Sequence, residues 1–190
     1  FKDGRSIERY SFPIFRQGRL SGRGWNFRDV TGRKRIEEKL RQSELSFRSL
    51  YENSGDAIMI FNPEKGCYAD CNKEAVRMYG YPSKAELLHA NPVILSSPRQ
   101  ADGQPSGERA MATMDRALKV GPHTFDWLCR RYDGRELALT VTLSPMFFQG
   151  TRCVAAIKRD ITARKRMEDS LKEQQQRLDF VFNATRDGIW

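Results

Sequence analysis

The chain has 190 residues, of which 39% are hydrophobic and 11% aromatic, enough for the core of one domain of roughly 100–150 residues with flanking segments. Its net charge of +9 does not indicate a nucleic-acid partner, because much of the excess lies in two short basic runs, each followed by acidic residues, as on the solvated face of a helix. No signal peptide and no apolar stretch of about 20 residues is visible. We therefore expect a cytoplasmic segment without direct membrane contact and with four reduced cysteines, while an anchor elsewhere in a longer parent chain stays open.

Two segments of twelve residues match closely. Residues 29–40 (DVTGRKRIEEKL) and 160–171 (DITARKRMEDSL) share seven identical positions at an offset of 131 residues. The match continues without a gap to the last residue, and upstream "RQG" at 16–18 resembles "FQG" at 148–150. A repeat of this length has the size of a domain rather than of a solenoid unit. We expect the C-terminal strands of one unit at 1–31, a linker helix at 32–53, a complete unit at 54–163, a second linker helix at 164–182 and the start of a third unit at 183–190.

Both predicted linker helices carry apolar residues at heptad spacing. Each series has one polar position, Ser43 in the first copy and Gln174 in the second. Because the phase is the same in both copies, we expect each helix to pair with its twin in a homodimer; the alternative is an amphipathic helix packed on its own domain. The apolar members are Ile36, Leu40, Phe47 and Leu50 in the first copy and Met167, Leu171, Leu178 and Val181 in the second.

Between the linker helices, the chain first predicts two strands, at 56–62 and 67–71, joined by a turn. Asn72 then has the side chain of a helix N-cap, and Gly80 is placed to end that short helix. Ser83, with Glu86 three residues later, predicts the start of another helix through a capping box.

The second half of this unit begins with a loop at 89–107, rich in Pro and Gly, and a helix at 108–120. Three strands follow, at 123–132, 135–148 and 151–162, with hairpin turns at Asp133-Gly134 and Gln149-Gly150. Strands joined by hairpins pair antiparallel, so the order of two strands, several helices and three strands predicts an α+β fold.

Four motifs together resemble the PAS domain, the sensory module of bacterial signalling proteins, over about residues 43–163: "DAIMIFNPEKG", "CNKEAVRMYGY", "FDWLCRRYDGRELALTVTLSP" and "RDIT". The resemblance implies a five-stranded antiparallel sheet in the order 2-1-5-4-3 with helices over one face. It also implies a sensor in a tandem array that acts on further PAS units and an output module of the same chain. That module is expected to be a histidine kinase in a two-component phosphorelay; the alternatives are a diguanylate cyclase or phosphodiesterase. The segment itself carries neither module, so we expect no enzyme activity from it.

The residues that carry chemistry in enzymes are not arranged for catalysis here. There is no Gly-rich phosphate loop, no HExxH and no Gly-x-Ser-x-Gly, and no Cys or His set suits a metal. PAS domains that bind haem carry an axial His on the helix before the third strand, and 108–120 has none. The Asn-Cys-Arg-Phe-Leu-Gln box of light-sensing flavin domains is also absent. The resemblance thus argues against haem and against a flavin–thiol adduct, while another flavin or a small ligand stays open.

We expect an apolar cavity between the sheet and its helices to detect a small-molecule or redox signal. The alternative is that side chains fill this space completely and leave a protein-interaction scaffold. The candidate lining residues are Met59, Val76, Tyr79, Met111, Met114, Trp127, Leu139, Val141, Cys153 and Ala155.

The closing "RDIT" predicts how a change in the sheet is passed to the linker helix that follows it. Asp160 ends the last strand, and we expect Thr162 to cap the helix that follows; Asp29 and Thr31 are expected to do the same upstream. A shift in the sheet would then move the helix, and the polar seam residues Ser43 and Gln174 would lower the free-energy difference between two packings of the paired helices.

Overall fold

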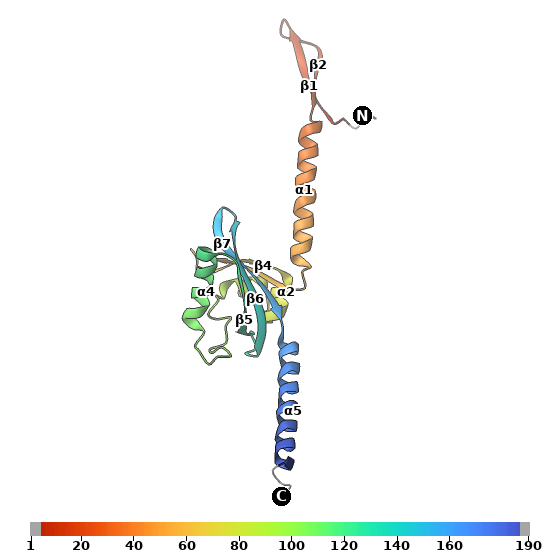
Figure 1. Ribbon diagram of the computed structural model, residues 1–190. Coiled ribbons are helices and arrows are strands. Elements are labelled where there is room, and N and C mark those ends of the chain that lie inside the picture. The colour runs from red at the N-terminus through yellow and green to blue at the C-terminus, as the bar shows by residue number, and fades with distance from the viewer. Residues whose placement is uncertain (1–4, 187–190) are drawn as a thin grey trace. The chain divides into compact units, whose positions relative to one another are not determined.

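The computed structural model describes residues 5–186 and divides into two compact units, residues up to Leu50 and residues from Tyr51 on. The first unit contains strands β1 (Ile7–Arg16) and β2 (Arg19–Asp29) and most of helix α1 (Thr31–Glu52) (Figure 1). β1 and β2 pair antiparallel. Gln17 and Gly18 both have positive φ, as a type I′ turn requires.

Little of the first unit is buried. Helix α1 has no buried residue, and its heptad seam is open to solvent. The aromatic side chains of the hairpin are also exposed, because two strands alone cannot cover them. These exposed aromatic residues include Tyr10, Phe12, Phe15, Trp25 and Phe27.

The second unit is built on a five-stranded antiparallel sheet in the order β4-β3-β7-β6-β5 (Figure 1). When the strands are numbered within this unit, the order is 2-1-5-4-3, so the predicted α+β fold is confirmed. The strands are β3 (Ala57–Asn62), β4 (Cys67–Cys71), β5 (His123–Arg130), β6 (Glu136–Phe148) and β7 (Thr151–Asp160).

Helices α2 (Lys73–Tyr79), α3 (Lys84–His89) and α4 (Gly107–Val120) cover one face of this sheet. The predicted N-caps of α2 and α3 and the predicted C-terminal glycine of α2 are confirmed. Asn72 Oδ1 accepts the N–H of Ala75 at 3.0 Å, and Ser83 Oγ accepts the N–H of Glu86 at 3.2 Å. Gly80 ends α2 with φ of 69°, in the left-handed region that glycine adopts without strain.

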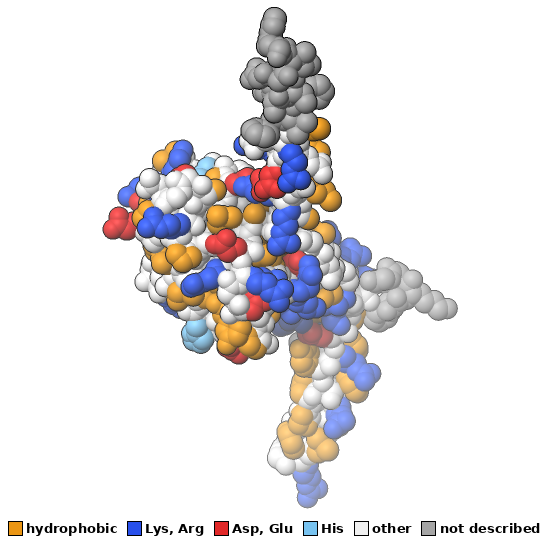
Figure 2. Space-filling model, turned by 90° about the horizontal axis from the view of Figure 1, so that it is seen from below, with side chains coloured by type: hydrophobic (Ala, Val, Ile, Leu, Met, Phe, Trp, Pro, Cys, Tyr) orange, Lys and Arg blue, Asp and Glu red, His pale blue; other side chains and the backbone are white. Residues whose placement is uncertain are grey.

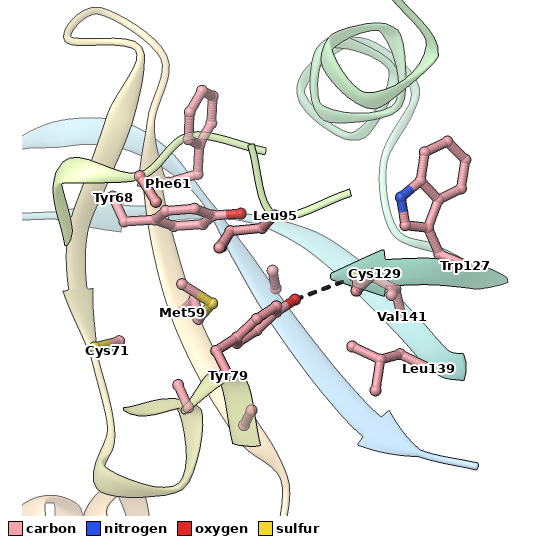
Figure 3. Packing of buried hydrophobic residues seen from close by; sticks show 14 of the residues in the cluster. Met59, Phe61, Tyr68, Cys71, Tyr79, Leu95, Trp127, Cys129, Leu139 and Val141 are labelled. Atoms are coloured by element: carbon pink, nitrogen blue, oxygen red, sulfur yellow. Dashed lines mark hydrogen bonds between the residues drawn. The ribbon is translucent and has the colours of Figure 1, made fainter. Parts of the chain in front are cut away.

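Strand pairing decides which side chains face the helices. Met59 lies opposite Ala156 and Phe61 opposite Val154, and paired residues point to the same face of a sheet. Figure 3 shows Met59, Phe61, Leu139 and Val141 in the resulting core. The helix-covered face of β7 therefore carries the even-numbered residues, including Lys158 opposite Ala57.

The loop before α4 covers the outer edge of β5. The N–H of Ser97 donates to Leu128 O at 3.0 Å, and the N–H of Arg130 donates to Leu95 O at 2.9 Å. The Gln100 side chain accepts the N–H of Leu128 at 2.7 Å and donates to its carbonyl at 3.0 Å. Loop backbone and one buried amide thus occupy hydrogen-bonding groups that an edge strand normally leaves open.

Helix α5 (Thr162–Arg186) follows β7 after a single residue. It continues through residues 183–186, where we expected the next unit to begin, and residues 187–190 lie outside the described part of the chain. A strand there would need neighbouring strands to pair with. No helix among residues 5–186 combines the length and the apolar character needed to cross a lipid bilayer.

Acidic side chains accompany the basic runs that begin the two long helices. Arg33 lies 3.7 Å from Glu37, and Arg164 lies 3.5 Å from Glu168, in each case four residues along the helix. Figure 2 shows Asp and Glu side chains among Lys and Arg on one face of the molecule. Part of the positive charge is therefore neutralised locally.

Candidate ligand cavity and relay joint

A small cavity lies between the sheet, α4 and the loop before it. Its volume of about 30 Å³ is room for roughly two water molecules. Pockets for drug-sized ligands measure about 300–1,000 Å³, so neither a flavin nor a haem fits with the side chains as they stand. The cavity is lined by Tyr68, Pro92, Leu95, Ser96, Ala110, Thr113, Met114, Phe125, Trp127, Cys129, Val141, Leu143 and Lys158.

Most of the predicted pocket residues lie in this part of the core. Met114, Trp127 and Val141 line the cavity. Met59, Tyr79 and Leu139 are fully buried in the same core but form no part of the wall, and Val76 is partly buried against it.

Three predicted pocket residues lie elsewhere. Met111 is 39% exposed, because the buried stripe of α4 runs through Ala110 and Met114 and leaves the next position facing outward. Cys153 and Ala155 are on the opposite face of β7 from the core, since Ala155 pairs with Ile60. The prediction placed these two side chains on the wrong face of the sheet.

Lys158 was missed, although it lies in the wall of the cavity. Its side chain is only 4% exposed, and Nζ donates to Tyr79 Oη at 2.8 Å. Tyr79 Oη in turn donates to Cys129 Sγ at 3.3 Å (Figure 3). Burial lowers the pKa of the Lys158 ammonium, and no carboxylate offsets this effect.

The groups around Lys158 are neutral at physiological pH. Burial raises the pKa of Tyr68, of Tyr79 and of the Cys129 thiol, so none of them supplies a negative charge. The Tyr68 hydroxyl is buried and has no hydrogen-bond partner among the described residues. Lys158 Nζ lies 5.5 Å from the centre of the Tyr68 ring and 4.9 Å from that of Tyr79, within cation–π range.

The neighbouring Trp127 is held in place by its own contacts. Its Nε1 donates to Ser96 Oγ at 2.9 Å, and its ring meets Phe125 edge-on at 5.6 Å between centroids. Arg109 lies over the ring at 5.6 Å. Trp127 therefore forms a fixed part of the cavity wall.

The relay joint after β7 consists of Asp160, Ile161 and Thr162. The Asp160 carboxylate accepts the N–H of Thr162 at 2.8 Å. Thr162 Oγ1 does not cap α5 as predicted; it accepts the N–H of Ala138 on β6 at 3.1 Å. The N–H of buried Ile161 donates to the Ala138 carbonyl at 2.9 Å. The first turn of the helix is thus attached to the neighbouring strand.

The joint before α1 has the same contacts. Asp29 accepts the N–H of Thr31 at 2.9 Å, and Thr31 Oγ1 accepts the N–H of Ser6 at 2.9 Å. Val30 is buried, and its N–H donates to the Ser6 carbonyl at 2.9 Å. Thr31 Oγ1 also donates to Asp29 at 2.6 Å, and these hydrogen bonds lower the pKa of the Asp29 carboxyl. The four predicted relay residues of the two joints are therefore brought together in pairs.

The other two predicted relay residues, Ser43 and Gln174, are exposed on α1 and α5. The seam residues Leu40 and Leu171 on the same helices are 60% and 67% exposed. From Ile36 to Leu50 and from Met167 to Leu178, the seams thus present mostly apolar, uncovered faces.

Further contacts connect the two ends of the second unit. Arg159 forms a bidentate ion pair with Asp56, at 2.8 and 3.0 Å, beside the start of β3. The buried Asn72 amide donates to the carbonyls of Asp56 and Tyr51, each at 3.0 Å. On the other side of the joint, Lys165 of α5 lies 3.1 Å from Asp126.

Comparison with known proteins identifies the family. Residues 55–163 match the sequence model of the PAS domain, and the chain belongs to this family. It is 27% identical over 161 residues to sporulation kinase E of Bacillus subtilis and 27% identical over 143 residues to the methyl sulfide methyltransferase-associated sensor of Methanosarcina acetivorans. These matches cover 85% and 75% of the chain but only 20% and 14% of the relatives.

Solved structures agree on the fold. The PAS domain of an HTR-like protein from Haloarcula marismortui superimposes with a TM-score of 0.55 at 23% identity. The match covers 67% of this chain and 99% of that domain. The chain is thus a PAS sensory domain of the kind found in signalling proteins, with flanking segments.

Proposed function

We propose that this chain detects a small molecule in the cavity of its second unit and relays the signal through α5 to a histidine kinase of a two-component phosphorelay. One observation carries the proposal: a single strand, β7, joins the cavity to the helix. Lys158 lines the cavity, and Asp160, two residues later, holds the first N–H of α5. A displacement at Lys158 would therefore reach the helix through three residues of continuous backbone. The kinase relative supports this choice of output.

We also propose that the module works as a homodimer in a tandem array. The seam residues of α1 and α5 have the spacing of a two-stranded coiled coil, and the apolar ones from Ile36 to Leu50 and from Met167 to Leu178 are exposed in the isolated chain. The first hairpin has the same turn and the same joint as β6, β7 and α5, as expected for the last two strands of a preceding PAS unit. The cytoplasm is the proposed location, because all four cysteines are free.

The relay can be tested at the polar seam position of α5. In a full-length protein that carries this segment, Gln174→Leu should favour one packing of the paired helices and hold the output at one level. Gln175→Leu, one residue away and off the seam, is the matched control and should leave the response unchanged. Autophosphorylation from ATP reports the output. A normal response in the Gln174 variant would show that seam register does not carry the signal, and absence of phosphotransfer would rule out a kinase.

A further inference from the structure

Lys158 is a buried amine with no carboxylate partner among the described residues. Lysine is almost never fully buried unless it is paired, because a charge removed from water is strongly destabilised. Yet no acidic side chain lines the cavity in the described part of the chain, and no carboxylate there lies close enough to affect the pKa of Lys158. Among the described residues, its hydrogen bond is to the neutral hydroxyl of Tyr79, and two of the three ammonium N–H groups have no acceptor there.

A second donor in the same wall is also unused. Tyr68 is only 3% exposed, and nothing in the described part of the chain accepts the proton of its buried hydroxyl or donates to its oxygen. Figure 3 shows the Tyr68 hydroxyl pointing toward Leu95, another wall residue. A buried polar group without a partner is unfavourable by about 1–3 kcal/mol and calls for a ligand or a water.

We propose that the cavity binds a short-chain carboxylate of two or three carbons, held by the Lys158 ammonium and the Tyr68 hydroxyl. The proposal rests on the sensory function proposed above and names the ligand class for the same site. The carboxylate supplies the missing counter-ion and accepts charge-assisted hydrogen bonds. The short alkyl chain lies against Met114, Val141 and Leu143, which make this part of the wall apolar.

The size of the cavity sets the upper limit on this ligand. At about 30 Å³ it accepts only a few non-hydrogen atoms unless a wall residue moves. Met114 is unbranched and adapts most readily to an added methylene. Neutral molecules of the same size, such as propionamide, leave Lys158 without a counter-ion and bind more weakly.

Binding should weaken as the pH rises. Above the pKa of Lys158 in the free protein, which burial has lowered, a carboxylate binds only with uptake of one proton, so the affinity falls by up to tenfold per pH unit. The titratable groups that face Lys158 are Tyr68 on β4, Tyr79 on α2 and Cys129 on β5, while α4 and the loop contribute no ionisable lining residue. Burial raises the pKa of all three, so they stay neutral in this range.

The test is a titration of the 190-residue chain with sodium propionate, followed by NMR chemical shifts at constant ionic strength against sodium chloride. We expect saturable shifts for the cavity residues and for the Lys158 side chain. Lys158→Met should weaken binding about tenfold or more, and Tyr68→Phe, which removes one oxygen and keeps the ring, by a smaller factor. Lys65→Met, at an exposed lysine in the β3–β4 turn, is the control and should bind like the wild type.

Equal propionate binding in the wild type and the Lys158 variant would overturn the proposal, as would saturation by chloride or propionamide at the same concentration. The same experiments distinguish a failure of the proposed ligand from a failure of the proposed sensory function. If propionate does not bind but seam variants still change kinase output, the ligand class is wrong and the proposed function stands. If propionate binds through Lys158 but never alters output, the site stands and the sensory function fails.

Discussion

The two helix-entry joints of this chain have the same local geometry but rest on different sheets. In each, an aspartate accepts the N–H of a threonine two residues later, at 2.9 Å in the first and 2.8 Å in the second. In each, the threonine hydroxyl accepts a backbone N–H, from Ser6 just before β1 in the first joint and from Ala138 on β6 in the second. Both hairpins also turn through a Gln-Gly pair with positive φ at both positions.

What surrounds the joints differs. β6 and β7 lie inside a five-stranded sheet with helices over one face, while β1 and β2 form a sheet of their own. At the repeat position of Lys158, which is 4% exposed, the first unit has Phe27, which is 61% exposed. The Asp-x-Thr sequence and the adjacent backbone are therefore enough to form the hydrogen bonds of the joint. Only in the complete five-stranded sheet is the joint also connected to a cavity.

The strongest contrast should appear in core truncations. Leu139→Ala, at a fully buried position of β6, should lower the free energy of unfolding by about 2–5 kcal/mol through the lost burial and the cavity left behind. Phe12→Ala, on the exposed hairpin, should change it by less than about 0.5 kcal/mol. Urea denaturation followed by circular dichroism measures both. Similar losses would mean that the hairpin contributes a core of its own.

Removing the buried cation should stabilise the second unit. Lys158→Met should raise the free energy of unfolding by about 1–3 kcal/mol at neutral pH, because the burial of an unpaired polar group is relieved. The lowered pKa means that the unfolded chain binds this proton more tightly. Wild-type stability should therefore rise with pH from the folded-state pKa up to about 10.4, and the advantage of the variant should shrink over that window. Urea denaturation of both proteins at several pH values tests this prediction. If the free energy of unfolding of the wild type did not change with pH in this window, the prediction would be contradicted.

Loss of the joint hydroxyl should have a smaller effect. Thr162→Val removes the acceptor of the Ala138 N–H and should lower the free energy of unfolding by about 1–2 kcal/mol, while Thr162→Ser keeps the hydroxyl and serves as control. In the first joint, Thr31→Val should mainly speed hydrogen exchange of the Ser6 amide. Few side chains are packed around this joint, so its loss should change the free energy of unfolding little. Protection of Ala138 that survives in Thr162→Val would contradict this account.

The smallest effect belongs to the exposed ion pair beside the second joint. Arg159→Gln breaks the contact with Asp56 and should lower the free energy of unfolding by about 0.2–1 kcal/mol, less in high salt. Arg28, at the equivalent position of the first unit, is also exposed, and Arg28→Gln should have no measurable effect. Urea denaturation at low and high salt measures the free energy of unfolding of both variants. If the destabilisation by Arg159→Gln did not depend on salt, it would come from lost packing of the arginine side chain rather than from the ion pair.

Local signals made much of this fold predictable. A cap such as Asn72, a turn such as Gln149-Gly150 and the alternation of β6 each act within a few residues, and the structure contains all three. The strand order came from the family resemblance, because the sequence alone fixes only which strands are joined by hairpins.

The cavity was harder to predict because β7 is apolar on both sides. From Cys153 to Ile157 every residue is apolar, so alternation gives no sign of which set faces the helices. Cys153 and Ala155 therefore carry no local sign that they face away from the helices. Lys158 ends this run and looks like a surface lysine, and only the alternation from Val154 and Ala156 would have placed it inward.

The cover over the edge of β5 has a consequence for the proposed tandem array of PAS units. Tethered copies meet at high local concentration, and an open edge would invite a strand of one copy to insert beside a strand of the next. Here Gln100 and the backbone of Leu95 and Ser97 already occupy that edge. In such an array this unit could fold independently of its neighbours during synthesis, because the Gln100 amide and the loop backbone block strand exchange at this edge.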